Sequence, residues 1–271
     1  MKNHFFVVAI FASFFSLSAQ TSFNWFGSGN VFSLSAVEDC TLLSVGVALS
    51  GGDLILDNVL ELNRKTYDSS KIYNKNDVNP FDRFFMNEYS SSLDKTADVG
   101  VALSMLTPVV LLTTQKEEWL TVGVMYAETL LIANGLKEIT KLCVNRERPY
   151  MYYDSSTYPK EDLKDGDFAN SFPSGHATMS FAGATFASYT FCKYFPDSLW
   201  RYGVVAGSYA LALGTSTLRV LSGNHFMSDV LTGAALGSAV GFLVPALHTF
   251  NKKSDLNVAL LPTGILMRVK L

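Results

Sequence analysis

Three short polar segments carry residues that could bind and transfer a phosphate group, and the first runs from Lys141 to Pro149. Its two bases, Lys141 and Arg148, are seven positions apart, so a helix continuing through both would place them on one face. Pro149 predicts that the element ends at Arg148. Two cations at a helix end can clamp a phosphate. Taken alone, the pattern equally suits a basic helix end at a membrane surface.

The second segment, Phe172 to His176, lies directly before a long uncharged stretch. Ser174 is a good N-cap, and Gly175 allows a ligand to approach the backbone closely. Free amides at a helix N-terminus bind anions. His176, in the first turn, could then donate a proton to a leaving group. The alternative is a well-capped helix whose histidine has no chemical role.

The third segment, Arg219 to Asp229, also precedes a long apolar stretch. His225 and Asp229 are four positions apart, which predicts that they share one helical face. The carboxylate could hold one imidazole N–H and leave the other nitrogen free to attack. A metal site is not expected, because no further histidine or carboxylate cluster completes a ligand set and the nearby cations repel a divalent ion.

Together the three segments resemble the type 2 phosphatidic acid phosphatase superfamily. The matching pattern is Lys141-x6-Arg148-Pro149, then Pro173-Ser174-Gly175-His176, then Arg219-x5-His225-x3-Asp229. That superfamily groups lipid phosphatases with bacterial class A acid phosphatases, glucose-6-phosphatase and vanadium haloperoxidases. The resemblance covers about residues 96–250 in helix order and spacing.

The resemblance implies a role for each of these residues. His225 attacks phosphorus and forms a phosphohistidine, Asp229 orients it, and His176 protonates the departing alkoxide. No metal and no cofactor is implied, because cations and amides neutralise the phosphoryl oxygens. The phosphate-binding set is Lys141, Arg148, Ser174, Gly175 and Arg219.

One position departs from the family pattern. The family usually has serine immediately before the arginine of the third segment, where this chain has Leu218. A hydroxyl there could position the arginine, so its loss predicts weaker binding or an altered substrate. Ser216, Thr217 and Ser222 are near enough in sequence to compensate.

The elements that must position these segments are apolar. The 271-residue chain is 48% hydrophobic and 17% charged, below the roughly 25% charged residues of ordinary globular domains. The net charge of −3 implies nothing about partners, and because no basic block suits nucleic acid, no nucleic-acid partner is expected. Long stretches without charge or nearly so, rich in glycine, alanine and serine, predict helices that pack closely. These stretches are 99–114, 119–136, 177–192, 202–218 and 230–250.

We therefore predict an all-α fold, a helical bundle of five or six main helices with the active site at one end. The bundle is expected to be embedded in a membrane, although small residues could also line a soluble helical core. Residues 96–250 form this core, and residues 251–271 form a tail with a strand-like run. Cys40, Cys143 and Cys192 are expected to be buried thiols rather than a disulfide framework.

The N-terminal part is expected to serve export and attachment. Residues 1–19, with Lys2 before an apolar stretch, read as a signal peptide, and an uncleaved anchor is the alternative. Residues 20–95 form a lead-in and a polar loop. Within it, residues 37–62 are interrupted by Gly51-Gly52-Asp53, which favours an interfacial or re-entrant segment.

The sequence predicts a metal-independent phosphatase that hydrolyses a lipid phosphate or diphosphate monoester at the periplasmic side of a bacterial-type membrane. The resemblance implies that the three segments lie outside the cytoplasm, and the expected position of Lys116, the 193–201 loop and Lys252-Lys253 on the opposite face is consistent with this. The expected partners are a phosphorylated lipid and the membrane. Two alternatives are a soluble periplasmic nonspecific acid phosphatase and a non-catalytic membrane protein that binds phospholipid.

Overall fold

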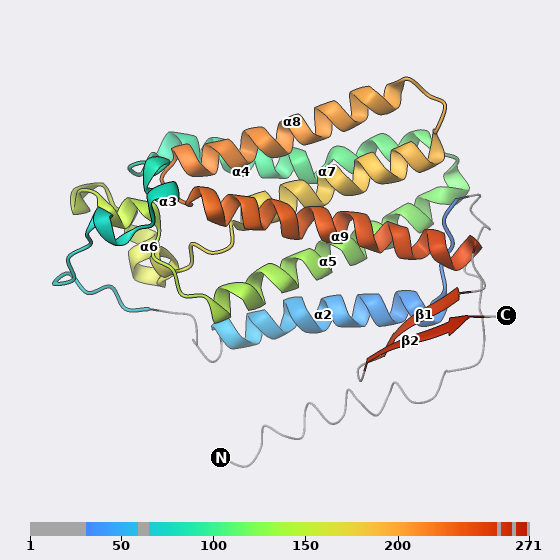
Figure 1. Cartoon of the computed structure of the whole chain (residues 1–271), viewed down its shortest axis with the longest axis horizontal. Coiled ribbons are helices and arrows are strands. Elements are labelled where there is room, and N and C mark those ends of the chain that lie inside the picture. The colour runs from blue at the N-terminus through green and yellow to red at the C-terminus, as the bar shows by residue number, and fades with distance from the viewer. Residues whose placement is uncertain (1–30, 59–64, 254–255, 262–263, 270–271) are drawn as a thin grey trace, which may run out of the picture.

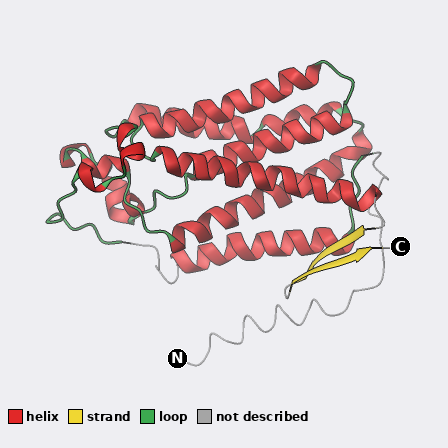
Figure 2. Cartoon of the chain, viewed as in Figure 1, coloured by secondary structure: helices red, strands yellow, loops and turns green. Residues whose placement is uncertain are grey.

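Six long helices lie side by side in one bundle (Figure 1; red in Figure 2), as the sequence predicts. The computed structural model describes residues 31–58, 65–253, 256–261 and 264–269, so the predicted signal peptide lies outside the described residues. The helices are α2 (Ala36–Asn58), α4 (Ser91–Met105), α5 (Trp119–Cys143), α7 (Gly175–Tyr194), α8 (Trp200–Leu221) and α9 (Met227–Lys253).

The shorter elements gather mainly at the two ends of this bundle (Figure 1). The tail forms an antiparallel hairpin of β1 (Leu256–Leu261) and β2 (Gly264–Val269), which agrees with the strand-like run predicted there. Two short helices are α3 (Pro80–Phe84) and α6 (Lys160–Asp165). The 3-10 helices are η2 (Lys75–Asp77), η3 (Thr107–Thr113), η4 (Lys116–Glu118), η5 (Pro149–Tyr152), η6 (Ser155–Thr157) and η7 (Asp167–Ala169).

The central helix α7 packs most closely on α9. Three glycines of α9 follow one another at intervals of four, Gly233, Gly237 and Gly241, and so share one helical face. A Cβ added at any of them would come closer than 3.0 Å to a carbonyl oxygen of α7. The small residues therefore allow the two helix backbones to touch, as expected from the sequence.

The largest apolar core lies in the half of the bundle away from the three polar segments. Met125 of α5, Phe186 of α7 and Val244 of α9 belong to it and are almost fully buried. Phe32, which precedes α2, is also fully buried there, and its ring meets Tyr194 edge-on with the centroids 5.3 Å apart. Through this core, the segment before α2 packs against α5, α7 and α9.

Helix α2 runs without interruption through Gly51 and Gly52, so the break expected there is absent. Glycine costs only about 1 kcal/mol in a helix interior, and packing can offset that cost. Gly46 meets Leu131 of α5, and Ser50 Oγ donates to the Leu131 carbonyl at 2.7 Å. At 23 residues, α2 is about 34 Å long. Whether it crosses or follows the membrane stays a prediction.

Among the residues that the structure describes, four stretches are long and apolar enough to cross a membrane. They correspond to the apolar segments that the sequence analysis singled out, except the one in α7. Their outward sides carry exposed apolar side chains such as Val99, Leu213 and Phe242. An apolar outer surface of this kind is that of a membrane protein. The stretches are Ser91–Thr113, Lys116–Cys143, Trp200–Leu221 and Met227–Thr249.

The expectation of buried cysteines is wrong for two of the three. Cys40 and Cys143 are exposed and Cys192 is partly buried, and all three are free thiols. In a bundle with apolar outer faces, an apolar sequence context does not distinguish a core position from an outward one. The context of these cysteines therefore could not predict their burial.

Candidate active site

The three polar segments meet at one end of the bundle, where α5 and α8 end and α7 and α9 begin (Figure 1). A cavity of about 520 Å³ opens there. Six of the predicted site residues line it, namely Lys141, Arg148, Gly175, His176, Arg219 and His225. The other two, Ser174 and Asp229, are fully buried at the ends of α7 and α9.

His225 lies just before α9, and its ring is fixed by the second segment. Its Nδ1 lies 2.7 Å from the Ser171 carbonyl oxygen. Because a carbonyl can only accept, Nδ1 carries the hydrogen and Nε2 keeps its lone pair. Burial, followed by the positive charges of Arg148 and Arg219, holds the pKa of His225 well below its usual value. The ring is therefore neutral at neutral pH, as a nitrogen nucleophile must be.

The direct contact predicted between Asp229 and His225 is not formed. The nearest Asp229 oxygen lies 3.9 Å from His225 Nδ1, beyond hydrogen-bonding distance. Helix α9 begins only at Met227, so His225 does not sit on a helical face with Asp229. Asp229 instead accepts from Ser171 Oγ at 2.6 Å and from the Phe226 N–H at 2.8 Å. Asp229 thus holds Ser171, whose carbonyl bonds the imidazole, and Phe226, which follows His225 in the chain.

Arg146 supplies the partner that a buried Asp229 requires. Its guanidinium lies 2.5 Å from Asp229 Oδ1 and 2.7 Å from Asp82 Oδ2. Asp82, on α3, is 1% exposed and also accepts from the Ser228 N–H at 2.9 Å. Helix α3 presents its phenylalanines outward, with Phe81 51% and Phe84 81% exposed. This chain of ion pairs therefore ties α3 to the start of α9.

Arg148 reaches the cavity by a route other than the one predicted. Helix α5 ends at Cys143, so Lys141 and Arg148 do not share a helical face. The backbone after it is extended, and the Arg148 N–H bonds the Phe168 carbonyl at 2.8 Å. The Arg148 side chain forms an ion pair with Asp167 and donates to Asn224 Oδ1 at 2.8 Å. Pairing with the 167–170 loop thus replaces the helix in positioning this cation.

Arg219 is held by α4 rather than by a hydroxyl of its own segment. Its guanidinium forms an ion pair with Asp94, which also accepts from Asn224 Nδ2 at 3.0 Å. Ser222 Oγ donates to the Arg219 carbonyl at 3.2 Å and accepts from Asn224 Nδ2 at 2.9 Å, and it does not bond the Arg219 guanidinium. Asp94 therefore performs the positioning that the family pattern assigns to the serine replaced here by Leu218.

Lys141 shares its wall of the cavity with a second lysine, Lys137, one helical turn earlier on α5. Both contact Glu138, with Lys141 Nζ 3.7 Å from it. A Cβ added at Gly175 would lie 3.4 Å from the Lys137 side chain. The start of α7 therefore lies beside Lys137, and four cations line the cavity, namely Lys137, Lys141, Arg148 and Arg219, rather than the three expected.

The N-terminus of α7 has the cap predicted from the sequence. Ser174 is the N-cap, and its side chain accepts from the Ala177 N–H. His176, in the first turn, lines the cavity, and its Nε2 lies 2.8 Å from Asp98 Oδ1 of α4. Burial, followed by the positive charge of Arg219, lowers the pKa of His176 to about 4, and the Asp98 carboxylate opposes this shift. A phosphate bound in the cavity would further stabilise the protonated ring that an acid catalyst needs.

Several residues of the site were missed by the sequence reasoning. Arg146 lies inside the first segment, and Lys137 precedes Lys141 by four, so spacing alone could have indicated both. Ser171 and Asn224 lie within two or three residues of predicted positions. Asp82, Asp94, Asp98 and Asp167 come from other segments, and only the fold brings them to the cavity.

A helical bundle with these segments at one end is the arrangement of the superfamily that the sequence resembles. Residues 122–253, just under half of the chain, match the model of the PAP2 superfamily. The lipid A 1-phosphatase of Rhizobium etli is 31% identical over 127 residues, 47% of this chain and 50% of that protein. The undecaprenyl-diphosphatase of Sulfolobus acidocaldarius is 32% identical over 122 residues, which are 45% of this chain and 53% of that protein.

Two further similarities are more limited. The lipid A 1-phosphatase of Porphyromonas gingivalis is 44% identical over 79 residues, 29% of this chain and 16% of that protein. A transmembrane PAP2-type phosphatidylglycerolphosphate phosphatase from Bacillus subtilis has 19% identity and a TM-score of 0.44, over 80% of this chain and 96% of that one. The matches thus span about half the length of the curated relatives, or less.

Proposed function

We propose that this chain is a metal-independent phosphatase that hydrolyses a phosphate or diphosphate monoester carried by a lipid, through a phosphohistidine at His225. The observation that carries the proposal is the His225 ring. Its hydrogen is committed to the Ser171 carbonyl, so its lone pair lies on Nε2, and the ring lines a cavity with four basic side chains. A protein that only binds phosphate needs the cations but no such nucleophile.

In the first half-reaction His225 Nε2 attacks phosphorus and the bond from phosphorus to the ester oxygen breaks. The departing alkoxide takes a proton from His176, whose Nε2 rests on Asp98 and whose Nδ1 is therefore left for the transfer. Arg148, Arg219 and the amides at the start of α7 neutralise the phosphoryl oxygens. Lys137 and Lys141 of α5 add positive charge to the same cavity.

In the second half-reaction water attacks the phosphohistidine and the bond between phosphorus and nitrogen breaks. Neutral His176 accepts the proton of the water, and inorganic phosphate leaves. His225 and His176 return to their starting states, so one water is consumed for each ester cleaved. Asp229 is a positioning residue, since it contacts Ser171 and the Phe226 N–H rather than the ring.

A lipid substrate is supported by the apolar helices that flank the cavity. Several of the four candidate spans reach the cavity end, so a phosphate at headgroup depth arrives already near the clamp. Burying a chain contributes about 0.8 kcal/mol per methylene, which favours a lipid over a soluble ester. The similarity to a lipid A 1-phosphatase and an undecaprenyl-diphosphatase makes a lipid A 1-phosphate and an undecaprenyl diphosphate the first two substrates to test.

The cavity is proposed to face the periplasm. Lys116 lies directly before α5, and the 193–201 loop joins α7 to α8. The start of α5 and this loop lie at the other end of the bundle (Figure 1), and basic residues in loops favour the cytoplasmic side. Residues 1–19 would then direct the export of the chain, as a cleaved signal or an anchor.

The test compares a lipid phosphate in mixed micelles with glycerol 3-phosphate, on protein extracted from membranes. We expect a higher kcat/KM for the lipid and a requirement for detergent during extraction. Protein in the salt-washed soluble fraction, with equal activity on small phosphomonoesters, would establish the soluble acid phosphatase instead. Tight binding of lipid phosphate with no release of inorganic phosphate would establish the non-catalytic alternative.

A further inference from the structure

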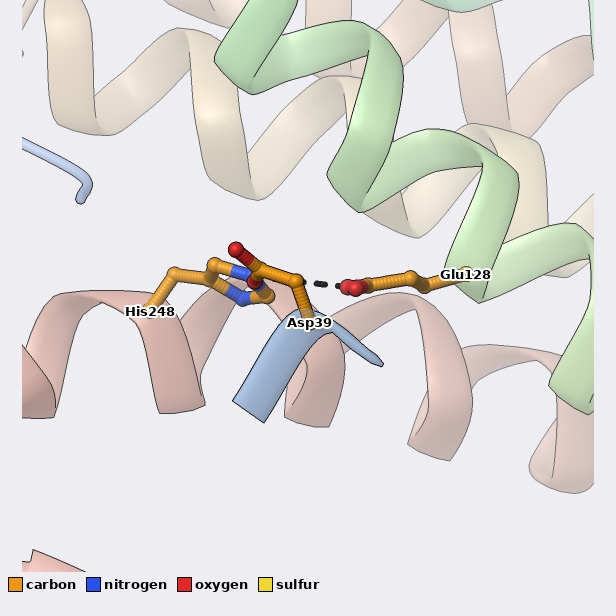
Figure 3. A group of neighbouring side chains, drawn as sticks. All are labelled: Asp39, Glu128 and His248. Carbon is orange, nitrogen blue, oxygen red and sulfur yellow. Dashed lines mark hydrogen bonds and ion pairs between the residues drawn. The ribbon is translucent and has the colours of Figure 1, made fainter. Parts of the chain in front are cut away.

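A second polar cluster lies inside the other half of the bundle, and the phosphatase chemistry does not use it. Asp39 of α2, Glu128 of α5 and His248 of α9 point toward one another (Figure 3). Their exposed fractions are 7%, 0% and 2%. His248 Nε2 lies 2.9 Å from Asp39 Oδ1 and 3.4 Å from Glu128 Oε2. Three chemistry-bearing groups from distant parts of the chain thus share one buried point.

The hydrogen positions in this cluster leave an excess of lone pairs. His248 Nδ1 lies 2.8 Å from the Val244 carbonyl oxygen, which can only accept, so this nitrogen carries a hydrogen. In the neutral ring, Nε2 then has a lone pair directed at two carboxylates. Three acceptor atoms facing one another in a buried site repel unless something positive lies between them.

A proton alone does not satisfy all three groups. Placed on His248 Nε2, it forms one good hydrogen bond, to Asp39 at 2.9 Å. Both oxygens of Glu128 are buried and have no hydrogen-bond partner in the described part of the chain. No lysine or arginine pairs with the cluster within the same described ranges. A buried carboxylate without a partner is costly, so the cluster has a deficit of positive charge.

We propose that Asp39, Glu128 and His248 bind a divalent metal ion of the Zn²⁺ type. One imidazole and two carboxylates are ligands that this ion accepts, at about 2.0–2.2 Å each. Two atoms bound to the same ion can then be at most about 4.4 Å apart. The distances from His248 Nε2 to Asp39 Oδ1, 2.9 Å, and to Glu128 Oε2, 3.4 Å, are within this limit. The bond from His248 Nδ1–H to Val244 orients the ring, as such bonds do for metal-binding histidines.

The ion would join α2 to the rest of the bundle. Asp39 lies outside residues 122–253, the part that matches the PAP2 model, whereas Glu128 and His248 lie inside it. The cluster is in the half of the bundle away from the catalytic cavity (Figure 1), and none of its residues lines that cavity. Its role is therefore structural, and it is independent of the proposed phosphatase function.

The first test is the metal content of the full-length protein, purified in detergent without chelator and without a polyhistidine tag. After dialysis against Zn²⁺ and removal of free ion, mass spectrometry should find about one metal ion per chain. Glu128→Gln and His248→Gln should lose it. Glu118→Gln, a control at another buried carboxylate, bonded to Tyr194 at 2.7 Å, should keep it. A metal-free wild-type protein overturns the proposal.

The second test is thermal unfolding with and without a membrane-permeant chelator. Chelation should lower the Tm of the wild-type protein and leave that of Glu128→Gln unchanged. If the cluster instead holds only a proton, chelation changes neither Tm, and Glu128→Gln is as stable as the wild type or more so. That result also overturns the proposal. Should the variants fail to fold, the wild-type metal content and its Tm response still decide.

Discussion

The two ends of α9 each place a histidine among carboxylates, but the balance of charge differs. At His225 the carboxylates are matched by basic side chains, with Asp94 on Arg219, Asp167 on Arg148 and Asp229 on Arg146. At His248 two carboxylates face one imidazole, and no basic side chain pairs with them in the described ranges. One end therefore attracts an anion and the other a cation.

Accessibility separates the two ends as well. The His225 end has a cavity of about 520 Å³ lined by four basic side chains, which a phosphate could reach. The His248 end is closed, with each of its three residues less than 10% exposed. Histidine and carboxylates are thus proposed to take part in catalysis at the open His225 end and to stabilise the fold at the closed His248 end.

Exchanging each histidine for glutamine should break this comparison most sharply. His225→Gln removes the nucleophile, so kcat on a lipid phosphate should fall by at least about 10⁴-fold with an unchanged Tm. His248→Gln breaks a buried ionic cluster, which costs about 3–5 kcal/mol, so Tm should fall while kcat at low temperature stays within a factor of a few. Equal losses of activity in both variants would contradict the division of roles.

His176→Ala should have the next largest effect, and one that depends on the substrate. General acid catalysis contributes about 10²–10⁴-fold, so hydrolysis of an alkyl phosphate should slow by that amount. A nitrophenyl phosphate needs little protonation of its leaving group and should lose far less. The ratio of the two rates in wild type and variant is the measurement. A common loss on both substrates would assign His176 to binding instead.

Asp229→Asn should reduce kcat by up to about 10²-fold, because it loosens the segment that holds His225 without changing the tautomer of the ring. Ser171→Ala removes the 2.6 Å bond to Asp229 but keeps the carbonyl that holds His225. Its loss should be roughly tenfold, in line with about one hydrogen bond. If Asp229→Asn abolished turnover as completely as His225→Gln, a direct contact between the two would have to form during the reaction.

Chelation should have the smallest effect on turnover. Because side chains neutralise the phosphate, initial rates should be unchanged in excess EDTA, whereas vanadate should inhibit by mimicking the pentacoordinate phosphorus at His225. The assay is short and at low temperature, so that any loss of stability at the His248 end does not change the measured initial rate. Activity abolished by EDTA and restored by magnesium would contradict the proposed site.

Much of this site could be predicted because its chemistry lies in contiguous segments. Residues 172–176 are an example. Ser174, Gly175 and His176 follow one another in the sequence, and together they indicate a capped helix N-terminus that can bind an anion. The apolar stretches likewise predicted the bundle. The length of each stretch predicts a helix, and its small residues predict close packing, without knowledge of any tertiary contact.

The missing parts depend on tertiary contacts that no local pattern encodes. Asp94 and Asp98 belong to α4 and meet Arg219 and His176 only after the bundle has formed. The bond from His225 to a backbone carbonyl leaves no trace in side-chain types at all. Cluster residues such as Glu128 are isolated polar positions in apolar helices, and their convergence depends on helix packing.

Under the proposed function, helix α3 would lie at the boundary between water and hydrocarbon, which its exposed Phe81 and Phe84 suit. Its buried Asp82 is paired with Arg146, which in turn contacts Asp229 beside His225. The depth of α3 would then set the depth of the cavity, so that the distance from phosphate to acyl chain would become a basis for choosing among lipids.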